Sequence, residues 1–231
     1  MAVITISRQY GSGGDEIARL LCERTGYTLF DKRILTKAAR EAGLSDQEII
    51  DYAEDNHKVK NFFDRLLGRS HPVAEVHLWR EDADGVRVVD EVKLSEEHAI
   101  NLVKEAIKTA HQAGNMVIVG RGGQVILEDR PGVLHVRIEA PLEDRILRVR
   151  NDPEIAPLSY GASHEGRRIA QDLIQTKDAA SADYLKRFYN VSWDDPALYH
   201  VILNTGMLSI EQSVQMLFAM AQTIDRVPEF S

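Results

Sequence analysis

A glycine-rich turn near the N-terminus is the part of this chain best suited to chemistry. It follows an apolar, β-branched stretch at residues 2–6 and precedes an amphipathic stretch. Glycines let a backbone approach a ligand closely, and a helix that starts after such a turn collects partial positive charge at its unpaired N–H groups. This arrangement binds phosphate. The candidate phosphate-binding residues are Gly11, Ser12, Gly13, Gly14, Asp15 and Glu16.

The turn departs from both common phosphate-binding patterns. When the second glycine of the Walker pattern is placed on Gly13, Gly14 takes the position of the lysine and Asp15 that of the magnesium-binding hydroxyl. Arg8 takes the position of the first glycine. The dinucleotide pattern G-x-G-x-x-G meets Glu16 where its last glycine belongs. Two interpretations stay open: a phosphate-binding loop, which the spacing favours, or a glycine turn whose two acids complement the helix dipole and repel phosphate.

The elements around this turn indicate a parallel α/β fold. Short apolar stretches alternate with helical patterns at residues 15–24, 94–112 and 165–189, and such alternation is typical of a parallel sheet covered by helices. Strands that are buried on both faces are expected to be this apolar. The predicted strands are residues 2–6, 27–30, 116–119, 133–138 and 200–203.

The long segment between the second and third strands predicts an insert. Residues 34–67 have a helical pattern that a turn at residues 43–46 interrupts. Residues 76–80 and 86–89 alternate around an Asp-Ala-Asp-Gly sequence, which favours a β-hairpin. The hairpin is expected to form a small flap.

Composition excludes several classes of protein. The 231-residue chain has a formal net charge of −8, whereas non-specific nucleic-acid binding usually needs a basic surface. No apolar run approaches the roughly 20 residues that span a bilayer. The first residues have no secretory pattern, so we expect a cytoplasmic protein without a membrane partner. A single cysteine, Cys22, cannot form an internal disulfide. The oligomeric state stays open.

Four segments, in this order, resemble the cytidylate kinase-like family of P-loop proteins, which are relatives of the nucleoside monophosphate kinases. They are residues 4–14 (ITISRQYGSGG), 30–33 (FDKR), 117–123 (VIVGRGG) and 199–205 (YHVILNT). The resemblance implies a single P-loop domain over residues 1–231. Its five-stranded parallel sheet would have the order 2-3-1-4-5, with a monophosphate-binding insert at 34–95 and a helical lid at 145–190. It also implies phosphoryl transfer from ATP, with Mg²⁺, to a nucleotide such as CMP.

The resemblance also suggests roles for single residues. Asp31 matches an aspartate that lies near the acceptor, although it could equally cap the helix that begins at Ile34. Arg121 matches an arginine that reaches into the cleft after the third strand. Arg8 could replace the missing loop lysine, because an arginine neutralises charge and binds two oxygens at once. The lid residues expected to close over the phosphates are Lys177, Lys186 and Arg187. No protein ligand for a metal is assigned.

Three positions lack a cation that phosphoryl transfer would use. Gly14 replaces the loop lysine, a feature that the resembling subfamily shares. Two departures are particular to this chain: Asp15 stands where relatives often carry a basic residue, and Ser181 stands where relatives place an arginine. Losing these cations weakens the case for a fast kinase, since phosphoryl transfer depends on charge neutralisation. A nucleotide or anion sensor without catalysis, and an interaction module that uses the hairpin, therefore remain alternatives to a kinase.

Overall fold

The structure is a computed structural model that describes residues 2–30, 74–81, 87–94, 96–152 and 164–224. Asp31, the helical pattern at 34–67 and the hairpin turn lie outside these residues. The chain divides into two compact units, one of Met1–Leu29 with Ala110–Ser231 and one of Phe30–Thr109. The single domain and its insert boundaries stay predictions.

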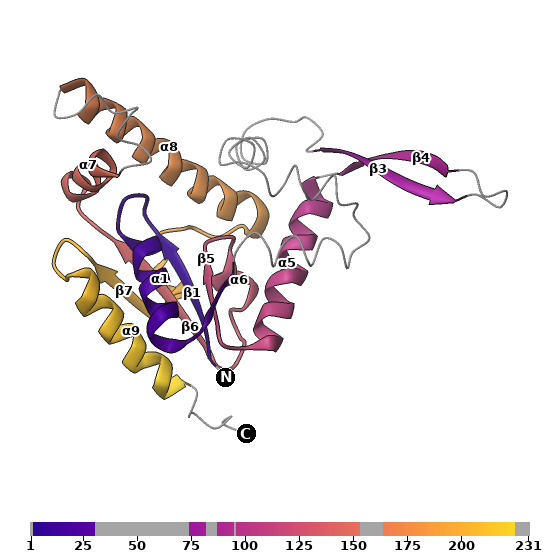
Figure 1. Ribbon diagram of the computed structural model, residues 1–231. Coiled ribbons are helices and arrows are strands. Elements are labelled where there is room, and N and C mark those ends of the chain that lie inside the picture. Colours follow the sequence, from indigo (N-terminus) through magenta and orange to yellow (C-terminus); the bar gives the residue numbers. More distant parts are fainter. Residues whose placement is uncertain (1, 31–73, 82–86, 95, 153–163, 225–231) are drawn as a thin grey trace. The chain divides into compact units, whose positions relative to one another are not determined.

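A five-stranded parallel sheet forms the centre of the first unit (Figure 1). The spatial order is β2-β5-β1-β6-β7, so β1 lies in the middle. Numbered among these five strands alone, this is the predicted order 2-3-1-4-5. The predicted strands are confirmed, with ends that shift by one or two residues. Their bounds are β1 Val3–Arg8, β2 Thr28–Phe30, β5 Met116–Val119, β6 Val133–Glu139 and β7 Val201–Asn204.

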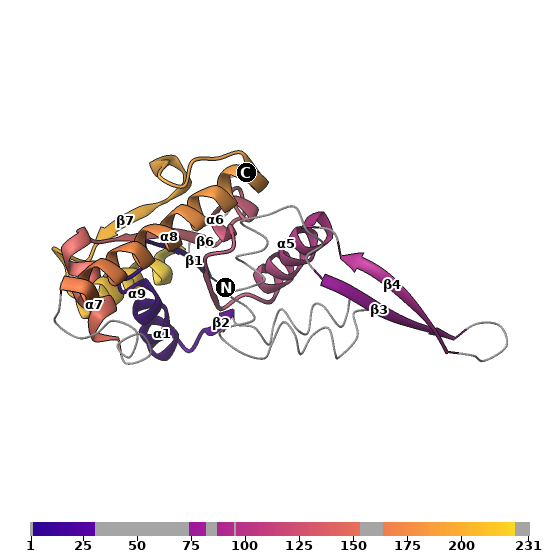
Figure 2. The same cartoon turned by 90° about the horizontal axis from the view of Figure 1, so that it is seen from above.

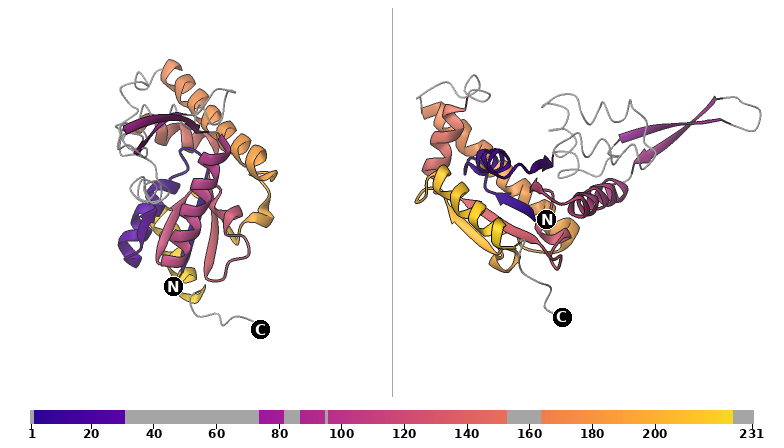
Figure 3. Two further views of the ribbon diagram at one scale, coloured as in Figure 1. Left: turned by 90° about the vertical axis from the view of Figure 1, so that its right-hand side faces the viewer. Right: turned by 60° about the horizontal axis from the view of Figure 1, so that its bottom comes forward.

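One face of the sheet is apolar and packs on two helices. Ile4 and Ile6 of β1 lie in register with Leu134 and Val136 of β6, and all four are buried in one core cluster. Helices α1 (Gly14–Thr25) and α9 (Ile210–Ile224) cover this cluster and lie side by side (Figure 3). Burial of these aliphatic side chains, each worth about 1.5–3 kcal/mol, is the main stabilisation of the first unit.

The opposite face of the sheet carries buried polar side chains. Thr5 and Ser7 alternate with the apolar residues of β1, and His135 and Arg137 do the same on β6. Strand periodicity puts all four on one face. The short helix α6 (Gly123–Ile126) packs against β1. The segment after α8, with the 3₁₀ turn η2 (Pro196–Leu198), supplies buried Trp193 and Tyr199, which bond Ser7 and shield this face from water.

Helices α7 (Leu142–Asn151) and α8 (His164–Tyr189) pack against each other around their own small core (Figure 2). Ile146 and Val149 of α7 meet Ala170 and Ile174 of α8, and Tyr10 from the glycine turn packs on the same cluster. The predicted helix at 165–189 is confirmed. Because Tyr10 packs in this cluster, α7 and α8 contact the turn between β1 and α1 directly.

The second unit contains the predicted hairpin. Strands β3 (Ala74–Glu81) and β4 (Arg87–Leu94) are antiparallel, with Val76 opposite Val92 and Glu81 opposite Arg87. Helix α5 (Glu96–Ala113) follows and continues into the first unit. Among the described residues, the structure contains no helix that is long and apolar enough to cross a membrane.

Candidate functional site

The glycine turn at residues 9–14 joins the end of β1 to the start of α1. Gly11 and Gly13 have φ values of +78° and +83°, a conformation that L side chains rarely adopt. A Cβ atom at Gly13 would also lie 2.5 Å from Cδ1 of Ile210. Within the described part of the chain, no protein atom accepts a hydrogen bond from the amides of Gly11, Gly13, Gly14, Asp15 and Glu16. The turn thus has the shape and the donors of an anion site, while a bound phosphate stays a prediction.

Arg8 extends across the start of α1 in front of Gly14. A Cβ atom built at Gly14 would lie 2.5 Å from Cβ and 2.8 Å from Cγ of Arg8. Further out, Nη1 of Arg8 lies 3.1 Å from the position of a Cβ atom on Gly120, just after β5. Strands β1 and β5 are parallel neighbours, so Arg8 lies at the carboxyl edge of the sheet between them. Ligands of open α/β sheets bind at this edge.

Arg8 forms an ion pair with Asp15, which stands at the Walker hydroxyl position. Nε of Arg8 donates to the two carboxylate oxygens at 3.2 and 3.3 Å, and Nη2 lies 3.1 Å from Oδ1. The side chain of Asp15 is 69% exposed, so it does not fill the turn. Asp15 is thus a partner of Arg8 among the described residues. A structural ion pair between Arg8 and Asp31, the alternative to a role of Arg8 in phosphate binding, involves a residue outside the described part of the chain. An exposed pair of this kind is worth about 0–1 kcal/mol, which a ligand can replace.

Arg121 follows β5 in a left-handed conformation, with φ +59°. It stands between Gly120 and Gly122, and a Cβ atom on Gly122 would lie 2.8 Å from Cε2 of Tyr189. The ring of Tyr189 meets that of Tyr184 edge-on at 5.9 Å. Burial raises the pKa of the Tyr184 hydroxyl, and the nearby charge of Arg121 opposes this rise. The end of α8 therefore packs over the turn that carries Arg121.

The predicted lid residues lie along α8 in different surroundings. Lys177 is half-buried and precedes Asp178, which contacts the turn. Lys186 and Arg187 are exposed near the end of the helix. Lys186 donates to Oδ1 of Asn190 at 3.0 Å, and Arg187 lies over the ring of Phe188. Lys177 is therefore the lid candidate that stands next to a residue in contact with the turn.

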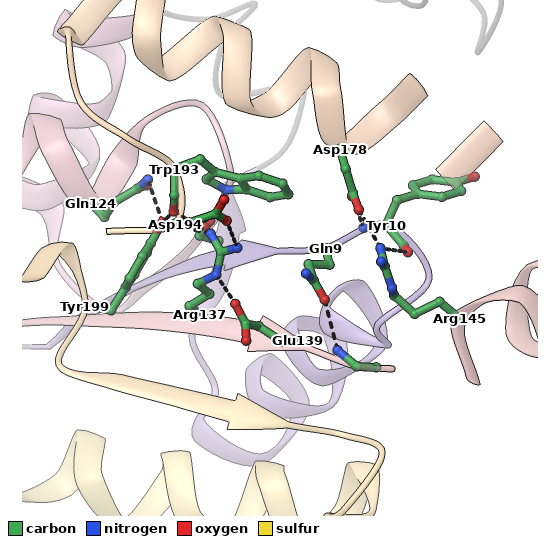
Figure 4. Close-up of polar contacts among 12 residues, drawn as sticks. Gln9, Tyr10, Gln124, Arg137, Glu139, Arg145, Asp178, Trp193, Asp194 and Tyr199 are labelled. Atoms are coloured by element: carbon green, nitrogen blue, oxygen red, sulfur yellow. Dashed lines mark hydrogen bonds and ion pairs between the residues drawn. The ribbon is translucent and has the colours of Figure 1, made fainter. Parts of the chain in front are cut away.

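The residues of α7 and α8 that hold the turn were not among the site residues predicted from the sequence. Asp178 accepts a hydrogen bond from the backbone amide of Tyr10 at 2.8 Å through Oδ1, and pairs with Nη1 of Arg145 at 2.5 Å through Oδ2 (Figure 4). Nη1 of Arg145 also lies 3.4 Å from the carbonyl oxygen of Tyr10. The three-residue spacing of Arg145 and Arg148 places both on one face of α7, and this was the available signal.

Arg148 and Thr205 hold the next two carbonyls of the turn. Nη1 of Arg148 donates to Oγ1 of Thr205 at 2.8 Å and lies 3.4 Å from the Gly11 carbonyl oxygen. Oγ1 of Thr205 donates to the Ser12 carbonyl oxygen at 2.6 Å. Thr205 belongs to the tail segment that carries the family resemblance, for which the sequence suggested no role.

Beneath the turn, Arg137 of β6 is 1% exposed and paired on several sides. Its guanidinium bonds Glu139 and Asp194, each at 2.5 Å, and stacks 4.5 Å above the ring of Trp193 (Figure 4). The indole Nε1 of Trp193 donates to Oγ of Ser7 at 2.8 Å, one residue before Arg8. This network fixes the end of β1 from which the turn starts.

A buried histidine lies on the same face of the sheet, further from the turn. Nδ1 of His135 is 2.7 Å from Oγ1 of Thr5, and its ring stacks on His200 at 5.0 Å. Burial first, and the neighbouring His200 second, lower the pKa of His135 to about 4. His135 is therefore neutral in the folded protein at neutral pH.

Neither a resident metal nor a reactive thiol is indicated by the described residues. Across residues 2–30, 74–81, 87–94, 96–152 and 164–224, no group of three or more His, Cys, Asp or Glu side chains could hold a metal ion. Cys22 is half-buried, and burial raises the pKa of its thiol to about 11. Thiolates, not thiols, are nucleophiles, so Cys22 is a packing residue.

Comparisons with known proteins agree with this geometry. The profile of the cytidylate kinase-like family matches residues 3–207, so the chain belongs to the cytidylate kinase-like family. None of the curated proteins matches the chain.

The chain is also similar to solved structures of low sequence identity. The chain is similar to an uncharacterized protein from Eubacterium ventriosum, with 18% identity, a TM-score of 0.58 and coverage of 96% of this chain and 99% of that one. It is also similar to shikimate kinase from Bacteroides thetaiotaomicron, with 13% identity, a TM-score of 0.49 and coverage of 96% and 98%. The likeness to the first of these structures shows a shared fold and no substrate.

Proposed function

We propose that this protein transfers a phosphoryl group from ATP to a nucleoside monophosphate such as CMP. Membership of the cytidylate kinase-like family supports a nucleotide ligand. The amides at residues 11 and 13–16 support a phosphate site, because within the described residues they donate to no protein atom. In the reaction, an oxygen of the acceptor phosphate attacks the terminal phosphorus of ATP, and the bond to ADP breaks.

The placement of Arg8 in front of Gly14 is the observation that carries this proposal. A lysine at position 14 would begin 2.5 Å from Cβ of Arg8, so the two cations exclude each other there. Arg8 therefore substitutes for the loop lysine and neutralises the negative charge of the donor phosphates. Its planar guanidinium can bind two phosphate oxygens at once.

We propose that the exposed carboxylate of Asp15 binds the magnesium ion that accompanies ATP. Magnesium bound with ATP would bridge and neutralise the donor phosphates. Asp15 stands at the position of the magnesium-binding hydroxyl, and a carboxylate is an oxygen ligand of the kind that Mg²⁺ prefers. Its side chain is 69% exposed, so it can leave Arg8 when phosphates arrive. Asp15 is thus the residue that would hold the ion.

The acceptor is proposed to bind near Arg121. Arg121 and Arg8 come from the ends of neighbouring parallel strands, and Arg8 extends to Gly120 beside Arg121. The left-handed backbone of Arg121 supports a functional role, because strained positions gather at binding sites. We propose Asp31 as the second acceptor residue. Lys177, Lys186 and Arg187 are proposed to approach the phosphates from α8.

A nucleotide sensor without catalysis is the second candidate. It is favoured by the ion pair between Arg8 and Asp15, which offsets part of the positive charge in the loop, and by Ser181 at the position of the missing lid arginine. A sensor and a kinase both bind nucleotide, and only a kinase releases ADP in the presence of an acceptor.

Titration calorimetry with MgATP, followed by an ADP-release assay with CMP, dCMP, UMP and AMP, tests the proposal. We expect MgATP binding and slow release of ADP with one acceptor. Arg8→Ala is expected to weaken MgATP binding by about 1.5–3 kcal/mol, the range for a charged hydrogen bond. Arg19→Ala on the exposed side of α1 removes an arginine that pairs with Glu23 and is the matched control.

The outcomes separate the candidate functions. Binding without turnover on any acceptor would establish the sensor. A wild-type protein that binds no nucleotide would reject both candidates and leave an interaction module. Equal MgATP affinity in Arg8→Ala and Arg19→Ala would show that Arg8 does not contribute to MgATP binding.

A further inference from the structure

The backbone of the phosphate loop is held by side chains that need not touch a ligand. Tyr10 is held on both sides of its peptide, since Asp178 accepts from its amide and Arg145 lies 3.4 Å from its carbonyl oxygen (Figure 4). Arg148 and Thr205 bind the carbonyl oxygens of Gly11 and Ser12. These contacts use the carbonyls of the loop and leave the amides at residues 11 and 13–16 for an anion.

Thr205 is the centre of this arrangement. It is 5% exposed, and its backbone amide donates to the Glu139 carbonyl oxygen at 2.8 Å. Its Oγ1 and its carbonyl oxygen both accept from Arg148, each at 2.8 Å. Its hydroxyl proton is donated to Ser12 at 2.6 Å. One residue therefore joins the ends of β6 and β7, the loop and α7 through buried hydrogen bonds, which are costly to leave unmade.

Both arginines on this face of α7 are committed to protein groups. Arg145 is paired with Asp178 of α8, with the two side chains 10% and 20% exposed. Arg148 holds Thr205 with both terminal nitrogens, a two-point contact that fixes the plane of a guanidinium. Side chains used in this way set the position of their partners and are poor candidates for direct contact with phosphate.

We infer that Arg148 and Thr205, together with Arg145 and Asp178, are positioning residues that keep the phosphate loop in its anion-binding conformation, an inference that rests on the proposed nucleotide site. We name these four residues the loop brace. A loop without the brace must be ordered when the ligand binds, and this ordering lowers affinity. The loss falls on the donor nucleotide alone, because the brace contacts the loop.

Thr205→Val tests the brace, because it removes the hydroxyl and keeps the shape of the side chain. Thr205→Ser restores the hydroxyl. The matched control is Thr176→Val on α8, where an exposed threonine also donates to a backbone carbonyl. The first readout is hydrogen exchange of the Tyr10 and Ser12 amides by NMR without ligand, since both amides are hydrogen-bonded within the braced loop. The second is the dissociation constant of MgADP.

We expect Thr205→Val to speed exchange at both amides and to weaken MgADP binding by roughly 3- to 10-fold, the equivalent of one or two hydrogen bonds. The dissociation constant of CMP should stay unchanged. Thr205→Ser and Thr176→Val should match the wild type in all three measurements. A uniform loss of affinity for MgADP and CMP would indicate general destabilisation and overturn the positioning role.

A second pair of variants covers the case in which Thr205→Val does not fold. Asp178→Asn keeps an oxygen near Tyr10 but loses the ion pair with Arg145, and Asp183→Asn on the exposed side of α8 is its control. Exchange at Tyr10 that equals the control would overturn the brace. Hydrogen exchange is measured without nucleotide, so it tests the loop brace even if the wild-type protein binds no nucleotide. A wild-type protein that binds no nucleotide would reject the proposed function and leave the brace to be judged by exchange.

Discussion

The side chain of Arg8 occupies the space that a side chain at position 14 would need: a Cβ atom on Gly14 would lie 2.5 Å from Cβ of Arg8. The presence of Arg8 and the absence of a lysine at position 14 therefore follow from one steric constraint in the loop. A chain with a side chain at position 14 needs a small residue at position 8, which is the order of the Walker pattern. This protein has the reverse order, with the cation at the end of the strand.

This relationship predicts that the two positions are energetically coupled. Gly14→Lys alone should lower the free energy of unfolding by about 1–3 kcal/mol, the usual cost of overpacking, and abolish MgATP binding. The double variant Arg8→Gly/Gly14→Lys has the Walker spacing and should recover both. Chemical denaturation and calorimetry of all four proteins give the coupling energy. Additive effects of the two substitutions would mean that the side chains do not compete.

Asp15→Asn separates the two roles open to Asp15. If Asp15 mainly restrains Arg8, its removal should tighten MgATP binding by about 0.2–1 kcal/mol, the value of an exposed ion pair. If Asp15 mainly holds magnesium, binding should weaken instead. We expect the tighter binding for ATP without magnesium and the weaker binding for MgATP. Glu23→Gln, which breaks the exposed pair with Arg19 on the same helix, should change neither.

Ser181→Arg should raise turnover. Ser181 is half-buried on α8, one turn after Lys177, to whose carbonyl oxygen its hydroxyl donates at 3.1 Å. An arginine aimed at the transferred group is worth about 10³–10⁵ in rate in other phosphoryl-transfer enzymes. We expect kcat for CMP to increase by about tenfold or more, measured by ADP release. Ala179→Arg adds the same charge at an exposed position of α8 and should leave kcat unchanged.

Stability should fall in mild acid because of His135. Its pKa is about 4 in the folded protein against 6.5 in the unfolded chain, so the unfolded chain takes up the proton first. The free energy of unfolding should therefore drop by about 3 kcal/mol as pH falls from 6.5 to 4, and this contribution should level off below 4. His135→Gln should remove that slope in denaturation curves. His164→Gln, at the exposed start of α8, should keep it.

Much of the fold follows from local patterns in the sequence. The short apolar runs predicted the five strands, and the glycine turn was expected at the junction where the structure places it. Alternation around residues 82–85 predicted the β3–β4 hairpin. These features depend on side-chain periodicity and on turn residues, which act over a few positions. The strand order came from resemblance to a family, because periodicity does not specify which strands pair.

One face of β6 shows what the apolar run at residues 133–138 left unspecified. His135 and Arg137 interrupt this run, which predicted a strand buried on both faces. Both side chains are nevertheless buried, since Trp193, Tyr199 and His200 arrive from the segment after α8. The residues that cover this face lie more than fifty positions away in the sequence, so no local pattern predicts that it is covered.

The sequence by itself determined the elements, the phosphate-loop candidate and the departures from the Walker pattern at Arg8, Gly14 and Asp15. Only the tertiary structure decided what these residues contact. Arg148 reaches Gly11 across 137 positions of the chain, and Thr205 reaches Ser12 across 193. Such bonds join a side chain to a backbone group, and a backbone group has the same chemistry in every residue. The chain must fold before geometry selects which carbonyl each donor meets.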